Sequence, residues 1–196
     1  MTKHRDDEKV PKRGPASSEA QSATHGEMRM TRQVSGYSTA QVALHWSVVV
    51  LVAFQYLAHD GMEAAWRAFL RNEPTAPDTS LLAYMHVVAG VTILLLALAR
   101  VHLRLTRGAP PPPPDEPRLL QILSEAVHGL IYLSLFLLPL SGGVAWFAGL
   151  EAAAAAHNVL KTALLGAIVL HIAGALFQHF VRRSDVMMRM FRPQRS

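Results

Sequence analysis

The sequence predicts an all-α membrane protein in which four transmembrane helices form one bundle. Hydrophobic residues make up 51% of the 196 residues, and they gather in four long runs instead of being spread along the chain. About 20 consecutive apolar residues are enough to cross a bilayer as a helix. The lysines and arginines flank these runs, which is typical of membrane proteins whose loops are sorted by charge. The length is typical of a single domain.

The N-terminal segment, residues 1–36, is predicted to be a disordered polar arm. It mixes both signs of charge and has almost no aliphatic residues, so it cannot bury enough apolar surface to fold alone. No apolar stretch follows its early basic residues, which argues against a cleavable signal peptide. The first membrane helix, predicted over about 39–58, then serves as an uncleaved signal anchor, with Ser38 as its N-cap.

Three further membrane helices follow. They are predicted over about 81–100, 122–148 and 155–181. The polar segment 59–80 separates the first two helices, and a short interfacial helix is expected around Trp66 and Phe69. A basic, proline-rich connection after the second helix should be stiff and extended. Pro139 is expected to kink the third helix, because proline removes a backbone hydrogen bond.

The basic residues also predict the orientation of the bundle. Lysines and arginines number seven in the arm, two in the first loop, four around the proline-rich connection, none in the third connector and five in the tail. Loops rich in these residues stay in the cytoplasm. Both termini and the proline-rich connection are therefore expected on the cytoplasmic side of the membrane.

Four histidines within the apolar runs are the candidate site residues: His45, His86, His157 and His171. A histidine in a membrane helix is costly and indicates function by default. Fourteen residues separate His157 from His171, a rise of about 21 Å that brings both to one helix face. With the predicted orientation, His45 lies at the level of His171, and His86 lies at the level of His157.

Two histidine pairs at two depths are the pattern expected for two bound haems. Two imidazoles from different helices can face one another across a gap wide enough for a porphyrin. Gly90 and Gly174, each about one turn from a candidate ligand, would let a flat macrocycle approach the backbone. The chain has no cysteine, which excludes disulfides, thiolate ligation, covalent haem attachment through cysteine and iron–sulfur clusters.

For other polar residues, the sequence does not decide between a functional and a structural role. His128, with Glu125 one turn before it, has no evident partner at its depth, so it contacts a propionate, contacts a quinone or simply packs. Lys161 either extends to the membrane interface or meets a propionate. Solvated or uninformative positions are expected for the remaining histidines, His4, His25, His59, His102 and His179.

At this point the chain resembles a known family, the bacterial cytochromes b561. The resemblance is carried by YSTAQVALHW, LLAYMHVVAG, RVHLRL with the proline run after it, AVHGLIYLSLFLLPLSG, LHIAGALFQHF and SDVMMRM, and it covers residues 37–193. It implies a four-helix membrane domain with two b haems per chain. It also implies axial ligation, and therefore iron binding, by the same four histidines, His45, His86, His157 and His171.

The resemblance further implies a function in electron transport. Members exchange electrons with the ubiquinone/ubiquinol pool, and some are similar to superoxide:ubiquinone oxidoreductases, so a quinone-linked oxidoreductase of the respiratory chain is the leading hypothesis. Its partners would be membrane lipid, quinone and superoxide or a periplasmic redox protein. No nucleic-acid partner is expected, because the net charge of +5 is not gathered in a patch.

Two alternatives stay open. In the first, the protein keeps its haems but is a membrane-anchor cytochrome b subunit that delivers electrons to a periplasmic redox partner. In the second, it is a haem-free transporter whose histidines relay protons or bind a metal. The transporter hypothesis predicts inverted internal repeats, and no such repeat is evident in the sequence.

Overall fold

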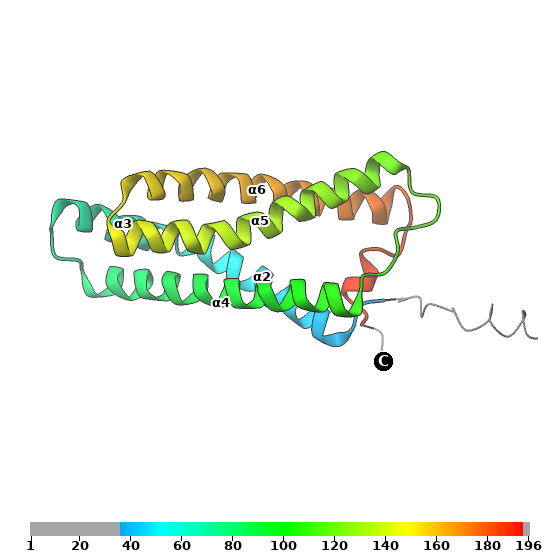
Figure 1. Cartoon of the computed structure of the whole chain (residues 1–196), viewed down its shortest axis with the longest axis horizontal. Helices are drawn as coiled ribbons and strands as arrows, with labels where there is room; N and C mark the ends of the chain where they lie inside the picture. The colour runs from blue at the N-terminus through cyan, green and yellow to red at the C-terminus, as the bar shows by residue number, and fades with distance from the viewer. Residues whose placement is uncertain (1–35, 194–196) are drawn as a thin grey trace, which may run out of the picture. The chain divides into compact units, whose positions relative to one another are not determined.

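The structure, a computed structural model, describes residues 36–193, so most of the predicted N-terminal arm lies outside the described residues. The described helices are α2 (Thr39–Leu57), α3 (His59–Arg71), α4 (Pro77–Arg107), α5 (Arg118–Ala148), α6 (Glu151–Phe180) and the short 3₁₀ helix η1 (Met188–Met190) (Figure 1). Four of them, α2, α4, α5 and α6, are long and apolar enough to cross a membrane. The predicted fold class, an all-α membrane bundle, is confirmed.

Several helices are longer than the apolar runs that predicted them. Helix α4 begins at Pro77, where proline suits the first turn, and it continues past residue 100 to Arg107, because nothing breaks it before Gly108. The run of alanines ahead of His157 is helical as well, so α6 begins at Glu151. Alanine has the highest helix propensity, which explains why this connector joins the helix.

Local signals fix the start of α2 and the shape of α3. The Ser38 hydroxyl accepts a hydrogen bond from the Gln41 amide, and the Gln41 side chain accepts one from the Ser38 amide. This capping box confirms Ser38 as the N-cap. The short helix expected around Trp66 and Phe69 is confirmed as α3. It lies close against α4, because a Cβ atom on Gly61 would come within 2.6 Å of Leu82.

The hydrophobic core of the bundle draws on all four long helices. Its buried residues are Val48 and Val52 from α2, Ile93 and Ala97 from α4, Leu135 from α5 and Leu164 from α6. Leu164 lies seven residues from His157 and seven from His171, so the core separates the two ends of the bundle. Large aliphatic side chains such as Leu95, Leu133 and Val169 are exposed instead, as lipid contact requires.

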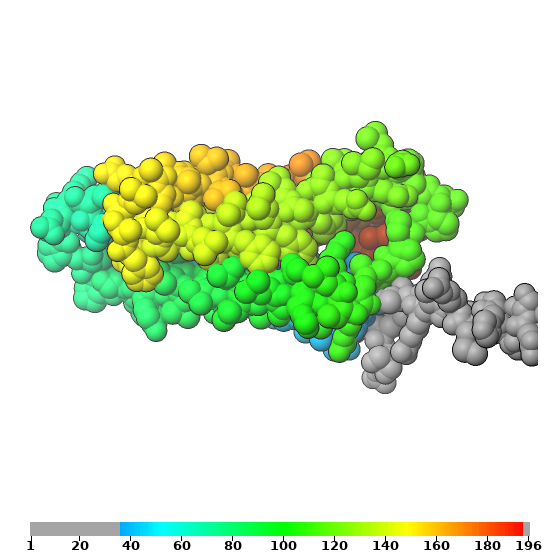
Figure 2. Space-filling view, in the orientation of Figure 1, coloured from blue at the N-terminus to red at the C-terminus, as the bar shows by residue number. Residues whose placement is uncertain are grey.

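The two ends of the bundle have different covers. One end carries α3 and the connection between α5 and α6, and we call it the α3 end (Figure 1). The other carries the proline-rich connection and the C-terminal tail, and we call it the proline end. In the space-filling view α4 and α5 lie against one another along the face shown (Figure 2).

The C-terminal tail is tied to the proline end by polar contacts. The Trp46 indole donates a hydrogen bond to the Met190 carbonyl at 3.0 Å, and its ring lies 5.1 Å from that of Phe191. The Arg189 guanidinium donates to the Pro111 carbonyl and also binds Asp185. That hydrogen bond from Arg189 holds the pKa of the Asp185 carboxyl below its ordinary value. The tail therefore covers the end of α2 that carries His45.

Candidate functional site

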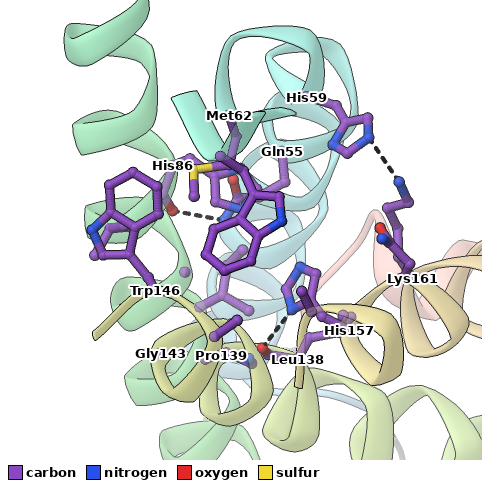
Figure 3. A pocket seen from close by; sticks show the side chains of 18 of the residues that line it. Gln55, His59, Met62, His86, Leu138, Pro139, Gly143, Trp146, His157 and Lys161 are labelled. Carbon is purple, nitrogen blue, oxygen red and sulfur yellow. Dashed lines mark hydrogen bonds between the residues drawn. The ribbon is translucent and has the colours of Figure 1, made fainter. Parts of the chain in front are cut away.

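At the α3 end, His86 of α4 faces His157 of α6. The centroids of their rings are 6.3 Å apart, and the ring planes make an angle of 56°. Both side chains line a cavity of about 570 Å³. Figure 3 shows this cavity, with Trp146 of α5 and Met62 of α3 also on its wall. The cavity walls are mostly apolar, so the two imidazoles are conspicuous polar groups within it.

The backbone of α5 holds the His157 ring in place. Its Nδ1 lies 2.9 Å from the Leu138 carbonyl oxygen (Figure 3). It also lies 3.3 Å from the Ser141 hydroxyl. A carbonyl only accepts, so Nδ1 carries the proton and Nε2 keeps its lone pair free for a metal. Gly142 makes the close approach possible, because a Cβ atom there would come within 3.0 Å of the ring.

The surroundings of His86 are less complete. The Gln55 amide donates to the His86 backbone carbonyl at 3.0 Å, which joins α2 to α4 at this level. However, Oε1 of Gln55 and Nδ1 of His86 are buried without a hydrogen-bond partner among the described residues. Buried polar atoms rarely stay unpaired in a folded protein. Their presence beside the cavity is consistent with a bound group or ordered water that completes the site.

At the proline end, three histidines meet. The ring centroids of His45 and His171 are 6.4 Å apart, and those of His128 and His171 are 4.9 Å apart. The expectation that His128 has no partner at its depth is therefore wrong. Nδ1 of His128 lies 2.6 Å from the Ser124 carbonyl oxygen and donates a hydrogen bond to it. The contact places the His128 ring, from α5, beside the His171 ring of α6.

A guanidinium with an unsatisfied N–H donor lies near these histidines. Nη1 of Arg100, on α4, is buried without a hydrogen-bond partner among residues 36–193. The guanidinium lies over the Tyr132 ring, 6.0 Å from its centroid. A ring face offsets only part of the cost of burying a charge. The guanidinium at the proline end could therefore also pair with an acidic group from outside the chain.

The geometry of both pairs suits a metal held between two imidazoles. Two metal–nitrogen bonds of about 2 Å each, together with the distance from each nitrogen to its ring centre, give a centroid separation of about 6 Å. The observed separations are 6.3 and 6.4 Å. Each pair leaves the metal's other positions to ligands from outside the chain. A porphyrin iron has this requirement, and the residues present fit it.

The sequence did not indicate one member of the site. His59, expected to be uninformative, lines the cavity at the α3 end, and its Nε2 lies 2.8 Å from Nζ of Lys161. Lys161 thus lines the cavity. The sequence had left two alternatives for its side chain, extension to the membrane interface or contact with a propionate. The position of Lys161 one helical turn after His157 was the sequence signal that placed it near the site. No spacing rule connects His59 to either residue, because they lie on different helices.

An all-α bundle with four membrane-length helices and two facing pairs of imidazoles has the architecture of a membrane cytochrome b. The comparisons with known proteins agree. The family model for prokaryotic cytochrome b561 matches residues 36–193. The chain therefore belongs to the prokaryotic cytochrome b561 family, and the resemblance noted from the sequence motifs is confirmed.

Three relatives show the range of the family around this chain. A cytochrome b562 from Cereibacter sphaeroides is 33% identical, over 83% of this chain and 99% of the relative. A probable superoxide oxidase CybB from Yersinia pestis is 26% identical, over 81% and 97%. Cytochrome b561 homolog 1 from Escherichia coli K12 is 28% identical, over 79% and 96%. Family membership assigns haem b and membrane electron transfer to this multi-pass bacterial membrane protein.

Proposed function

We propose that this protein carries electrons across the bacterial inner membrane through two b haems per chain. His86 and His157 would hold one haem at the α3 end, and His45 and His171 would hold the other at the proline end. The observation that carries the proposal is the two facing imidazole pairs, with ring centroids 6.3 and 6.4 Å apart, at opposite ends of one hydrophobic core. Along α6 the two ligand positions are about 21 Å apart.

The chain contributes ligation, orientation and exclusion of water. When bound, a haem iron supplies a one-electron redox couple. The Leu138 carbonyl holds the tautomer of His157 that presents Nε2 to a metal, and such second partners raise the basicity of a ligand. The buried core around Leu164 fills the space between the two sites with side chains. Two sites within one bundle divide the crossing of the membrane into short steps.

We propose ubiquinone as the electron partner at the proline end. In the proposed orientation this end faces the cytoplasm, where quinone can enter from the inner leaflet. Arg100, His102 and Arg104 on α4 supply hydrogen-bond donors there, and His128 adds an imidazole beside His171. Reduction of one ubiquinone to ubiquinol takes two electrons and two protons, so two single-electron transfers would serve each quinone.

We also propose superoxide as the first candidate donor at the α3 end, since one relative is described as a probable superoxide oxidase. Oxidation of superoxide to dioxygen releases one electron, which matches a one-electron acceptor. The α3 end carries Arg67, Arg71 and Lys161 as cations that can attract an anion. Superoxide:ubiquinone oxidoreductase is then the activity to assay first.

Spectroscopy of the purified protein tests the electron-transfer proposal. We expect about two b haems per chain from haem quantification and reduced-minus-oxidised difference spectra, and we expect ubiquinol to reduce them partly without any other reductant. Dithionite, which needs no binding site, is the control reductant. Protein without haem would overturn the proposal. If dithionite reduces the haems but ubiquinol does not, the quinone is not an electron partner of this protein.

The orientation has its own test. A reporter that is active only in the periplasm should be silent when fused after Ser196 and active when inserted near Pro74, between α3 and α4. The proline end, with the basic connection and tail, would then be cytoplasmic, because clusters of lysine and arginine resist export. The same reporter with the opposite pattern would place the proposed quinone site in the outer leaflet.

A further inference from the structure

The cavity at the α3 end contains a cation whose hydrogen bonds are incomplete. Nζ of Lys161 lies 2.8 Å from Nε2 of His59, and the two side chains point toward one another from α6 and α3 (Figure 3). An ammonium group only donates, so the His59 ring accepts this hydrogen bond through Nε2. Among the described residues Lys161 has no other side-chain partner. Two of its three N–H groups are therefore free for another acceptor.

The one carboxylate in the cavity lining, that of Glu63, is already paired with another cation. The ionisable residues of the lining are Tyr56, His59, Glu63, Arg67, His86, His157 and Lys161. Glu63 is the acidic member, and one of its oxygens binds Arg67 at 2.9 Å while the other lies 3.7 Å from Nε2 of His59. With Glu63 matched by Arg67, the charge of Lys161 is left over. An unmatched charge in a mostly apolar cavity is costly.

The backbone places this ammonium beside the candidate haem ligand. Lys161 follows His157 by one helical turn and therefore lies on the same face of α6. Helical side chains lean toward the N-terminus of their helix, so the lysine side chain reaches back toward the level of His157. The Tyr56 hydroxyl donates to the Lys161 carbonyl at 2.6 Å and ties α2 to α6 at this level. The ammonium is thus anchored through its backbone and through His59.

We propose that Lys161, positioned by His59, binds a propionate carboxylate of the haem in this cavity. The inference rests on the proposed function, since it requires a haem between His86 and His157. Haem b brings two carboxylates into a cavity that has one unmatched cation. A hydrogen bond between an ammonium and a carboxylate is about twice as strong as one between neutral groups. His59 keeps the ammonium in the cavity and prevents it from extending to the interface.

Replacing Lys161 by glutamine tests this pairing. We expect two haems to remain and the midpoint potential of the α3-end haem to fall, because a nearby cation favours the reduced, more negative state. The α3-end haem is the spectral component that His86→Ala removes. The expected change is about tenfold in its reduction equilibrium constant, which is 59 mV for one electron. The propionate bending band of this haem in resonance Raman spectra should shift as well.

Two matched variants separate pairing from a general charge effect. Lys161→Arg keeps the cation, so the midpoint potential should change little while the propionate band shifts with the new donor geometry. Arg71→Gln removes the same charge from the same end, but Arg71 does not line the cavity, so both readouts should stay as in the unchanged protein. An Arg71→Gln effect as large as that of Lys161→Gln would overturn the pairing.

Each remaining outcome also decides whether Lys161 pairs with a propionate. If Lys161→Gln keeps two haems with the potential and the propionate band unchanged, the pairing is wrong, although the proposed function stands. If Lys161→Gln loses the α3-end haem, the Lys161→Arg band decides, and an unshifted band there counts against the pairing. If the unchanged protein contains no haem between His86 and His157, the proposed function itself fails and the pairing fails with it.

Discussion

Replacing His86 or His157 by alanine should remove one haem, and replacing His45 or His171 should remove the other. Each pair of rings is within reach of a single metal, whereas His157 and His171 lie about 21 Å apart along α6. Haem content should fall from about two per chain to about one in each variant. The reduced-minus-oxidised spectrum should lose the same component within a pair and different components between pairs.

Controls make this result specific to ligation. His102→Ala removes an exposed imidazole from α4, the helix that carries His86, and should leave both haems bound. Methionine in place of a ligand should restore part of the lost component, since a thioether is also an axial ligand. Loss of one common component from both His45→Ala and His86→Ala would contradict the pairing.

Replacing Gly142 by alanine should weaken the binding of the α3-end haem and leave the binding of the other haem unchanged. The added Cβ atom would lie 3.0 Å from Nδ1 and Cε1 of His157, closer than ordinary van der Waals contact. The ring would have to move away from the Leu138 carbonyl that holds its tautomer. Loss of such a supporting partner weakens metal binding about 10–100-fold. The measurement is the haem content at the α3-end component after extended washing in detergent.

Gly166→Ala is the matched control for this variant. It makes the same substitution in a membrane helix, α6, but a Cβ atom at Gly166 would meet nothing within 4 Å. Both haems should therefore stay bound at the level of the unchanged protein. Equal retention of the α3-end haem in Gly142→Ala and Gly166→Ala would show that His157 is not confined by α5.

The fold class and the candidate ligands could be read from the sequence because both follow from local rules. A bilayer forces any spanning segment to satisfy its own backbone hydrogen bonds, so long apolar runs such as those of α4 and α6 had to be helices. The constant rise of a helix then placed His157 and His171 at two depths on one face. No packing information was needed for either step, and the four histidines expected as ligands form the two facing pairs in the structure.

Helix ends depended on information that hydropathy does not contain. The apolar run of α5 begins near residue 122, whereas the helix begins at Arg118. Arg118 lies ten residues before His128, and Phe180 lies nine after His171, which are rises of about 15 and 14 Å. The centroids of the two rings are 4.9 Å apart, so these two histidines lie at nearly the same depth.

The sequence alone determined that the chain crosses the membrane four times as helices and that its histidines lie at two depths. Only the tertiary structure decided which groups surround them. The Leu138 carbonyl and Gly142 meet His157, and His59 meets Lys161 across two helices. Periodicity within one helix fixes a face and a depth, but the rotation of one helix against the next follows from side-chain packing between segments far apart in the chain.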